Sequence, residues 1–400
     1  MKKLFKIGIW HYHGGSYANG GAFAYTEALQ EILTKTSFSG TEIVHVGYNI
    51  DQIFKSGSNA LSLTPIYRTK WPKLLNSICI RLPFFGIKLS NRIKKKYNNK
   101  LIDNLKHAGI EVIYYINPGI EIDNFPHIST LWDLGHISMF AFPEVSMHGK
   151  LESRIENLNR DINKALIICA ESEAGKKELI RYCPVNPDRI HVIPMIPGLI
   201  VKDQIATEQV DILANDKFFI YPARYWPHKN HYNLLLAFQQ FIFYFPKVKL
   251  VFTGANQNNI DYINSVIQNL GLEKNVIQLG VVSLPQLKWL YKNAISLVMP
   301  TFLGPTNMPL LEAYYLGCKV ICSRLDGHVE QLGEAARYFD PLNPNEIFVQ
   351  MKSLYEESIG DQKKAVEISY NETVTIAALN SLFLKVKHIK RTWGAVDEIS

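Results

Sequence analysis

The chain has 400 residues, of which 47% are hydrophobic and 20% are charged, and its formal net charge is +7. This length exceeds one ordinary hydrophobic core, so it predicts two globular domains and excludes a disordered or fibrous protein. No apolar run approaches the ~20 residues of a membrane-spanning helix. The five cysteines include no CxxC pair, which favours buried thiols in the reduced cytoplasm over a metal site or disulfides.

The first half of the chain alternates apolar runs with helical patterns. Residues 5–10 are a predicted strand, residues 11–21 a loop with two glycine pairs, and residues 22–33 a helix. Because such a loop lets the backbone approach a ligand closely, Gly15 is a candidate to hold its N–H near a phosphate. Further strands are predicted at residues 42–46, 112–116, 129–132, 166–169 and 189–193, and helices at residues 152–164 and 172–181.

The positive charge is concentrated in residues 66–106. This segment holds eleven Lys and Arg residues and one acid, Asp103, so it carries +10 while the rest of the chain carries −3. Bulky apolar residues lie between the basic ones, a mixture that suits an anionic membrane surface. The alternative is a solvated helical hairpin whose apolar residues face the core. Nucleic acid is not an expected partner, because no recognition motif accompanies the charge.

The second half restarts the alternation after a Pro-rich stretch at residues 194–215, which predicts an inter-domain linker. Strands that alternate with helices predict parallel sheets with both faces covered and a ligand cleft at the carboxyl ends of the strands. An amphipathic stretch at residues 377–389 is expected to pack back across the first domain. We therefore predict an α/β protein with domains at residues 1–198 and 199–375 and a C-terminal helix within residues 376–400. The predicted strands are residues 218–221, 249–253, 276–279, 294–299 and 319–322, and the helices are residues 232–245, 261–270, 285–292 and 308–316.

Residues 299–332 are the strongest candidate for a binding site. They predict a βαβ unit in which a loop rich in Gly, Pro, Thr and Asn opens onto a helix that Gly317 terminates. The free N–H groups and the positive dipole end of such a helix suit a phosphate. An alternative for Asn307 is simple N-capping, which is compatible with ligand binding. The candidate ligand-binding residues are Pro305, Thr306, Asn307, Met308 and Leu310, the last two through their N–H groups.

Several motifs occur in order along the chain. Residues 166–173 read LIICAESE and residues 191–194 read HVIP, while Arg224 is followed five residues later by Lys229. The sequence from residue 299 then runs MPTFLGPTNMPLLEAYYLG. Together these motifs resemble the retaining, GT-B-fold glycosyltransferases of family 4, the group 1 type. The resemblance implies two Rossmann-like, doubly wound parallel-sheet domains that face each other across a cleft.

The resemblance also implies roles for individual residues. Arg224 and Lys229 would bind the diphosphate of a nucleotide sugar and stabilise the charge that grows on it, and Glu312 would accept hydrogen bonds from the ribose. The alternatives are that Arg224 pairs with a surface acid and that Glu312 compensates a helix dipole. In the first domain the expected residues are His136 toward the reacting sugar, unless it is a structural histidine, Asp133 beside it or at the acceptor, and Glu144 at the acceptor. Gly280 is expected on the nucleotide side.

One departure from the family pattern concerns its pair of glutamates separated by seven residues. Glu312 matches the second, whereas Gly304 stands at the position of the first. The sequence GPTN in place of the usual loop is similar to a subgroup of bacterial surface-polysaccharide and O-antigen transferases. Because the chain has no DxD motif, we expect neither a metal nor a cofactor besides the donor substrate.

The expected function is that of a retaining hexosyltransferase, which moves a sugar from a nucleotide sugar to a growing, lipid-linked polysaccharide. Its expected location is the cytoplasm, peripheral to the inner face of the membrane. The subgroup suggests GDP-mannose, and UDP- and dTDP-sugars remain open. Two alternatives are a sugar-nucleotide epimerase, which the Arg224 and Lys229 motif disfavours, and a non-catalytic sugar-nucleotide or glycan-binding protein, which Gly304 suggests.

Overall fold

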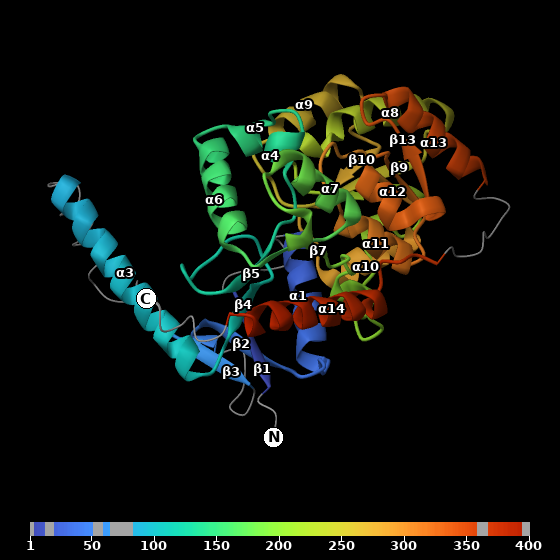
Figure 1. Cartoon of the computed structure of the whole chain (residues 1–400). Coiled ribbons are helices and arrows are strands. Elements are labelled where there is room, and N and C mark those ends of the chain that lie inside the picture. The colour runs from blue at the N-terminus through green and yellow to red at the C-terminus, as the bar shows by residue number, and fades with distance from the viewer. Residues whose placement is uncertain (1–3, 13–19, 51–58, 65–82, 358–366, 394–400) are drawn as a thin grey trace.

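The computed structural model describes residues 4–12, 20–50, 59–64, 83–357 and 367–393, with residues 83–91 as backbone only. These residues form two lobes, each built on one parallel sheet with helices on both faces (Figure 1). The strand order is β3-β2-β1-β4-β5-β6-β7 in the first sheet and β10-β9-β8-β11-β12-β13 in the second. Both are doubly wound orders: strands are added first on one side of β1 or β8 and then on the other side. The predicted fold class, the GT-B architecture, is confirmed.

The first sheet is centred on β1 (Phe5–His11), which pairs with β2 on one side and β4 on the other. Its apolar side chains are buried on both faces, as a central parallel strand requires. Strand β3 was not predicted, because its four residues lack a recognisable alternation. The other strands are β2 (Thr41–Tyr48), β3 (Ala60–Leu63), β4 (Val112–Tyr115), β5 (His127–Thr130), β6 (Ile167–Ala170) and β7 (Ile190–Val192).

The helices of this lobe include one long helix, α3 (Pro83–His107), which projects from the body in Figure 1. Its last turns pack on the first sheet through Leu101 and Leu105. In the described part of the basic segment the chain is one continuous helix. Residues 66–82 lie outside the described residues, so the helical hairpin stays a prediction. The other helices are α1 (Gly21–Lys35), α4 (Gly135–Ser138), α5 (Pro143–Ser146), α6 (Lys150–Lys164) and α7 (Glu173–Tyr182).

The second sheet has a core rich in aromatic residues, in which Phe218, Phe219 and Phe252 are fully buried. Helix α11 ends as predicted, since Gly317 has a φ of +76° directly after it. Strand β13 and helices α12 and α13 were not predicted. The strands are β8 (Phe218–Pro222), β9 (Lys249–Thr253), β10 (Val276–Gln278), β11 (Ser296–Met299), β12 (Val320–Ser323) and β13 (Ala336–Phe339). The helices are α8 (His231–Tyr244), α9 (Ile260–Asn269), α10 (Leu284–Asn293), α11 (Met308–Tyr315), α12 (Asp326–Leu332) and α13 (Pro344–Glu357).

The last helix, α14 (Glu372–Arg391), lies against the first lobe (Figure 1). Phe383 packs edge-on against Phe38 and Tyr114, at ring-centroid distances of 4.9 and 6.3 Å. The ring of His191 also contacts the carbonyl oxygen of Ala378 at 3.0 Å. The helix therefore ties the end of the chain to the sheet at its beginning.

The two lobes also touch beside the carboxyl ends of their strands. Glu330 of α12 accepts hydrogen bonds from the N–H groups of Glu173 (2.8 Å) and Ala174 (2.7 Å) in the first turn of α7. A carboxylate at a helix N-terminus satisfies free N–H groups and interacts favourably with the dipole. The rings of Phe142 and Phe302 stack across the same boundary, with centroids 5.7 Å apart. These contacts hold the two sheet edges close enough to enclose a site.

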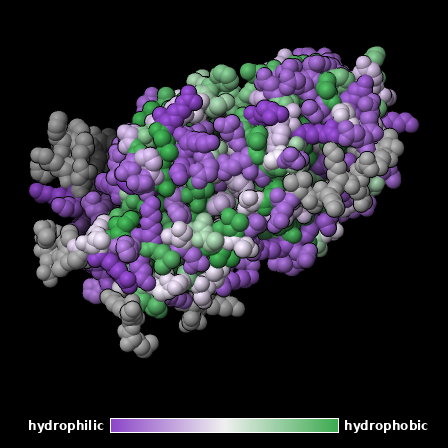
Figure 2. Space-filling view, turned by 45° about the vertical axis from the view of Figure 1, so that its right-hand side comes forward, coloured by the Kyte–Doolittle hydropathy of each residue, from purple (hydrophilic) through white to green (hydrophobic). Residues whose placement is uncertain are grey.

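The visible face of the molecule is mostly hydrophilic, with hydrophobic side chains in scattered groups (Figure 2). Within the described residues, no helix is long and apolar enough to cross a membrane. The four cysteines that the structure describes are buried and unpaired.

Candidate functional site

Two adjoining hollows lie between the carboxyl edges of the sheets. The larger cavity, of about 370 Å³, is lined by residues of both lobes, among them the charged side chains of Arg224, Lys229 and three carboxyl groups. The smaller pocket, of about 130 Å³, lies on the second lobe and has an apolar wall. They share the backbone of Gly20 and Gly21, the side chain of Arg224 and the start of α11. One elongated ligand with a charged middle can therefore occupy both.

Arg224 and Lys229 reach the larger cavity from the loop that follows β8. A short 3-10 helix, Pro227–Lys229, and the left-handed backbone of Asn230 (φ 58°) turn this loop into α8. The Lys229 Nζ donates to Asn307 Oδ1 at 3.4 Å. Burial lowers the pKa of Lys229 to about 8, so an anion beside it would restore its charge. The structure brings these two predicted cations together at the cavity wall.

Gly20 and Gly21 carry the first lobe's backbone to these cations. A Cβ at Gly20 would lie 3.6 Å from the Arg224 Nε, and one at Gly21 would lie 2.9 Å from the Cβ of Met308. The second distance is too short for a side chain, so glycine is required at this approach of the two lobes. Gly15, the glycine predicted to contact a phosphate, lies outside the described residues.

The loop before α11 is fixed by side chains of α12. The N–H of Asn307 donates to Gln331 Oε1 at 2.9 Å, and its Nδ2 lies 2.8 Å from the His328 Nε2. The Asn307 side chain makes no capping hydrogen bond to the helix, so the N-capping alternative is wrong. Instead, Asn307 links Lys229 to the buried His328.

The other predicted residues of this loop divide into two groups. Pro305, Thr306 and Met308 line the larger cavity, and Met308 also lines the smaller pocket. Leu310 lines neither, because its side chain is fully buried and its N–H donates to the Asn307 carbonyl oxygen at 3.3 Å. The Leu310 N–H is therefore engaged in the helix rather than directed at a ligand.

The smaller pocket combines one carboxyl group with an apolar wall. Glu312 is buried and its Oε2 accepts a hydrogen bond from the Tyr291 hydroxyl at 3.0 Å. Burial raises the pKa of Glu312 to about 7. Gly280 does not line the pocket, but its carbonyl oxygen accepts from the Gly254 N–H at 2.7 Å and so positions the residues that follow it. The apolar wall consists of Val281, Val282, Leu284 and Leu287.

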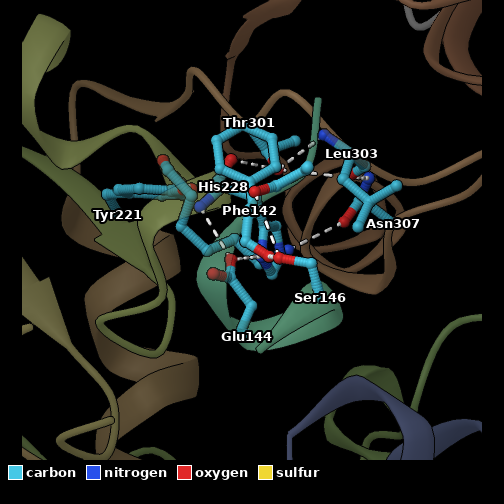
Figure 3. Close-up of polar contacts among 10 residues, drawn as sticks. Phe142, Glu144, Ser146, Tyr221, His228, Thr301, Leu303 and Asn307 are labelled. Atoms are coloured by element: carbon cyan, nitrogen blue, oxygen red, sulfur yellow. Dashed lines mark hydrogen bonds and ion pairs between the residues drawn. The ribbon is translucent and has the colours of Figure 1, made fainter. Parts of the chain in front are cut away.

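Glu144 and Asp133 line the larger cavity from the first lobe. Glu144 Oε1 accepts from the backbone N–H of His228 at 3.0 Å and lies 2.5 Å from its Nδ1 (Figure 3). Burial alone would raise the pKa of Glu144, but the hydrogen bonds from His228 outweigh it and lower the pKa. Asp133 Oδ1 accepts from the Gly135 N–H at 2.9 Å. Glu144 thus joins the two lobes besides facing the cavity.

His136 lines neither hollow, although it follows Asp133 by three residues. Its two ring nitrogens are buried without a hydrogen-bond partner, and burial together with Arg154 lowers its pKa. The short helix α4 is pressed against the second lobe, since a Cβ at Gly135 would lie 2.2 Å from the Leu303 Cδ1. The structure therefore does not bring His136 to the cavity with the other predicted residues.

Sequence reasoning missed three residues of this region. Glu171 lines the larger cavity, Tyr291 positions Glu312, and His228 holds Glu144. Glu171 directly follows β6, and side chains that follow parallel strands gather at the ligand-binding edge, so that signal was available. The sequence gives no such signal for Tyr291 and His228, because their partners Glu312 and Glu144 are distant in sequence. Among the described residues, no group of three or more His, Cys, Asp or Glu could hold a metal ion.

Comparison with known proteins bears on this arrangement. Residues 203–373 match the family of glycosyl transferases group 1. The fold is similar to that of sucrose-phosphate synthase from Thermosynechococcus elongatus, with a TM-score of 0.65 and 16% identity, over 96% of this chain and 100% of that one. The chain has the GT-B fold and resembles the group 1 glycosyltransferases.

Two further relatives of this GT-B protein are informative. The O-antigen chain mannosyltransferase B of Escherichia coli is 26% identical over 233 residues, which cover 56% of this chain and 60% of that protein. Anabaena HepE, solved in complex with UDP and glucose, has a TM-score of 0.58 and 16% identity, over 99% of this chain and 100% of that one. The aligned region thus spans about 60% of the curated relative's length, and the likeness to HepE concerns the fold.

Proposed function

We propose that this protein is a retaining glycosyltransferase that moves a sugar from a nucleotide-diphosphate sugar to a polysaccharide acceptor. The observation that carries the proposal is the pair of adjoining hollows, in which two cations stand where a pocket with an apolar wall meets a cavity lined by carboxyl groups. A nucleotide sugar has a matching order of parts: a flat aromatic base with its ribose, an anionic diphosphate and a hydroxyl-rich sugar. The group 1 match over residues 203–373 supports the same function.

The nucleoside would occupy the smaller pocket. Its base would lie on the apolar wall that Val281 and Leu287 help to form, and its ribose hydroxyls would donate to Glu312. The hydrogen bond from Tyr291 holds the Glu312 carboxyl in place before the ligand arrives. Such preorganisation lowers the entropic cost of binding.

The diphosphate would lie beside Arg224 and Lys229. As the bond between the sugar C1 and the diphosphate oxygen breaks, negative charge grows on the phosphate. Fixed cations there stabilise the transition state more than the ground state. In the proposed reaction a bond forms between C1 and the acceptor oxygen on the same face, and the departing phosphate takes the acceptor's proton. Neither a metal nor a cofactor enters these steps.

The acceptor would be a growing glycan carried on a lipid, at the cytoplasmic face of the membrane. Helix α3 supports this part of the proposal, because Lys94, Lys95 and Lys96 are exposed on a helix that projects from the body. Each lysine near an anionic membrane contributes about 1 kcal/mol of attraction. The relative in Escherichia coli is a mannosyltransferase, which favours mannose as the transferred sugar. GDP-mannose is the proposed donor, and UDP- and dTDP-sugars are the alternatives.

A binding screen followed by a turnover assay tests the proposed function. Purified protein is mixed with GDP-mannose, UDP-glucose or dTDP-rhamnose, or with the free nucleoside diphosphate of each. The Tm is then measured, since a ligand that binds the folded state raises the Tm. We expect one nucleotide to raise the Tm and Arg224→Ala to remove that shift. If no nucleotide changes the Tm of the wild-type protein, the proposal is wrong.

Vesicle flotation tests the membrane part. Vesicles with anionic lipid should carry the wild-type protein, and replacement of Lys94, Lys95 and Lys96 by Gln should weaken this binding. A triple replacement of the exposed Lys247, Lys274 and Lys292 is the charge-matched control. Equal flotation of the two triple variants would contradict a membrane role for α3.

A second candidate is a non-catalytic protein that binds a sugar nucleotide or a glycan, which Gly304 motivates. It predicts the same Tm shift without turnover. Release of the free diphosphate from the bound donor, measured with and without acceptor, distinguishes the two candidates.

A further inference from the structure

The carboxyl groups of the larger cavity come from one lobe, whereas its cations come from both. Arg224 and Lys229 belong to the second lobe, and the exposed Arg154 of α6 belongs to the first. Among the described lining residues the carboxyl groups are those of Asp133, Glu144 and Glu171, and all three belong to the first lobe. A ligand that spans the cavity would therefore have its anionic part at one wall and its hydrogen-bonding part at the other.

The loop of the second lobe cannot supply a carboxyl group of its own at position 304. Gly304 has a φ of +127°, a conformation that residues with a side chain rarely adopt. A Cβ there would also lie 2.5 Å from the Asn307 Nδ2 and 2.9 Å from the Thr306 carbonyl oxygen. The carboxyl groups that line this cavity come instead from the opposite lobe.

Glu171 reaches this loop from the opposite lobe. It follows β6, is 4% exposed, and its Oε2 accepts a hydrogen bond from the Thr306 hydroxyl at 2.7 Å. Thr306 is adjacent to Asn307, whose Oδ1 accepts from the Lys229 Nζ. The Glu171 carboxyl is thus connected through two neighbouring residues to the cation that would hold the diphosphate. A sugar attached to that diphosphate would lie within reach.

The second carboxyl oxygen of Glu171 has no partner in the protein. Glu171 Oε1 is buried without a hydrogen bond, while the residue lines the cavity. An unsatisfied buried polar atom costs about 1–3 kcal/mol, so its retention at a cavity wall points to a partner that arrives with the ligand. Burial raises the pKa of Glu171 to about 8. At neutral pH the carboxyl is mainly protonated and can both donate and accept.

The other two carboxyl groups differ from Glu171 in what they contact. Glu144 Oε1 takes two contacts from His228, and Asp133 Oδ1 accepts from the Gly135 N–H. Glu144 Oε2 is buried without a partner, as Glu171 Oε1 is, but of the three carboxyl groups it is Glu171 that is hydrogen-bonded to the loop preceding α11. Glu171 is therefore the carboxyl group placed at the junction of sugar and diphosphate.

We propose that Glu171 binds a hydroxyl group of the transferred sugar and thereby contributes to the choice of donor sugar. This inference rests on the proposed function, because it takes the cavity's ligand to be a nucleotide sugar. It assigns to the first lobe a contact with the donor sugar, beyond its role at the acceptor. Closure of the two lobes then completes the sugar site.

The test compares a nucleotide sugar with the corresponding free nucleoside diphosphate, which lacks the transferred sugar. Using the donor that the binding screen identifies, we expect Glu171→Ala to raise the Kd of the nucleotide sugar about 10- to 100-fold. This is the range expected for one to two lost hydrogen bonds to a buried group. The Kd of the free diphosphate should change less than about threefold. Glu171→Gln, which keeps the shape and hydrogen-bonding capacity, should fall between Glu171→Ala and the wild type. Equal weakening for both ligands would overturn the proposal, because it would show that Glu171 only holds the loop; so would no weakening.

Two further variants keep the result interpretable. Thr306→Val removes the hydroxyl that donates to Glu171 but leaves the carboxyl group, so it should affect sugar binding less than Glu171→Ala does. Glu273→Gln, on an exposed residue that lines neither hollow, is the matched control. With deoxy analogues of the donor, the wild type should lose affinity for one analogue and Glu171→Ala should lose none for it. If the wild type binds no nucleotide at all, the proposed function has failed rather than the role of Glu171 within it.

Discussion

The smaller pocket and the larger cavity differ in how the chain builds them. The smaller pocket takes its apolar wall, Tyr291 and Glu312 from within the second lobe, and among the described residues the first lobe adds three, from α1 and the loop before it. The larger cavity needs side chains from both lobes, including Glu144, Glu171 and Arg224. A ligand can therefore bind the smaller pocket whatever the position of the first lobe, whereas the larger cavity forms only when the lobes meet. Nucleotide binding and sugar transfer should respond differently to substitutions.

The largest effect is expected where the two hollows join. Arg224→Ala and Lys229→Ala each remove a fixed cation from the diphosphate, and each should lower kcat/KM for sugar transfer about 10²- to 10³-fold, or about 2.7–4 kcal/mol of barrier. Arg181→Ala, on an exposed arginine of α7, is the control. Transfer kinetics at saturating acceptor measure the effect. Unchanged kinetics in both cation variants would show that the reaction does not take place here.

The next effect is a pH dependence of stability that belongs to the larger cavity. Burial raises the pKa of Glu171 from 4.5 to about 8, with a smaller contribution from Asp133. Between these values the folded protein holds more protons than the unfolded chain, so its stability falls as pH rises. The slope is at most about 1.4 kcal/mol per pH unit for one group. Glu171→Gln should lack this part of the slope, whereas Glu273→Gln should keep it, in urea unfolding from about pH 5 to about pH 8. If the free energy of unfolding depends on pH in the same way in wild type and in Glu171→Gln, the raised pKa of Glu171 is contradicted.

A smaller effect is expected from loosening the boundary between the lobes. Glu330→Ala leaves two N–H groups of α7 without their carboxylate partner, and it also removes the acceptor of the Tyr370 hydroxyl. The free energy of unfolding should fall by about 1–2 kcal/mol. Because the larger cavity takes more of its lining from the first lobe than the smaller pocket does, the nucleotide sugar should lose more affinity than the free nucleoside diphosphate. Calorimetric titration of the two ligands measures these affinities, with Glu334→Ala, at an exposed residue, as control. Equal losses of affinity for the two ligands would mean that the nucleotide sugar binds without contact between the lobes.

The smallest effect is expected within the smaller pocket. Tyr291→Phe removes the hydroxyl that donates to Glu312 and leaves the packing intact. The Kd of both the nucleotide sugar and the free diphosphate should rise about fivefold, since a net hydrogen bond contributes about 1 kcal/mol. The kcat should be unchanged, because this contact is made equally in the ground and transition states. Tyr355→Phe, in a tyrosine that lines neither hollow, is the control. A loss confined to kcat would place Tyr291 in the chemical step instead.

Much of the fold could be predicted from the sequence because buried parallel strands are short apolar runs. The runs around Ile7, Val251 and Val298 are buried on both faces and gave a clear signal. Strands β3 and β13 gave a weaker one, because most of their residues are only partly buried at the ends of the sheets.

The sequence by itself determined the parallel sheets and the loops that carry Arg224, Lys229, Thr306 and Asn307 to the strand edges. These depend on local patterns: an apolar run, a glycine or proline at its end, and a helix start. Only the tertiary structure decided which side chains face the ligand. It moved His136 and Leu310 away from the cavity, engaged Glu144 with His228, and brought Glu171 to Thr306. Residues 135 positions apart meet there because two separately folded sheets dock edge to edge, and no local pattern in the sequence encodes that docking.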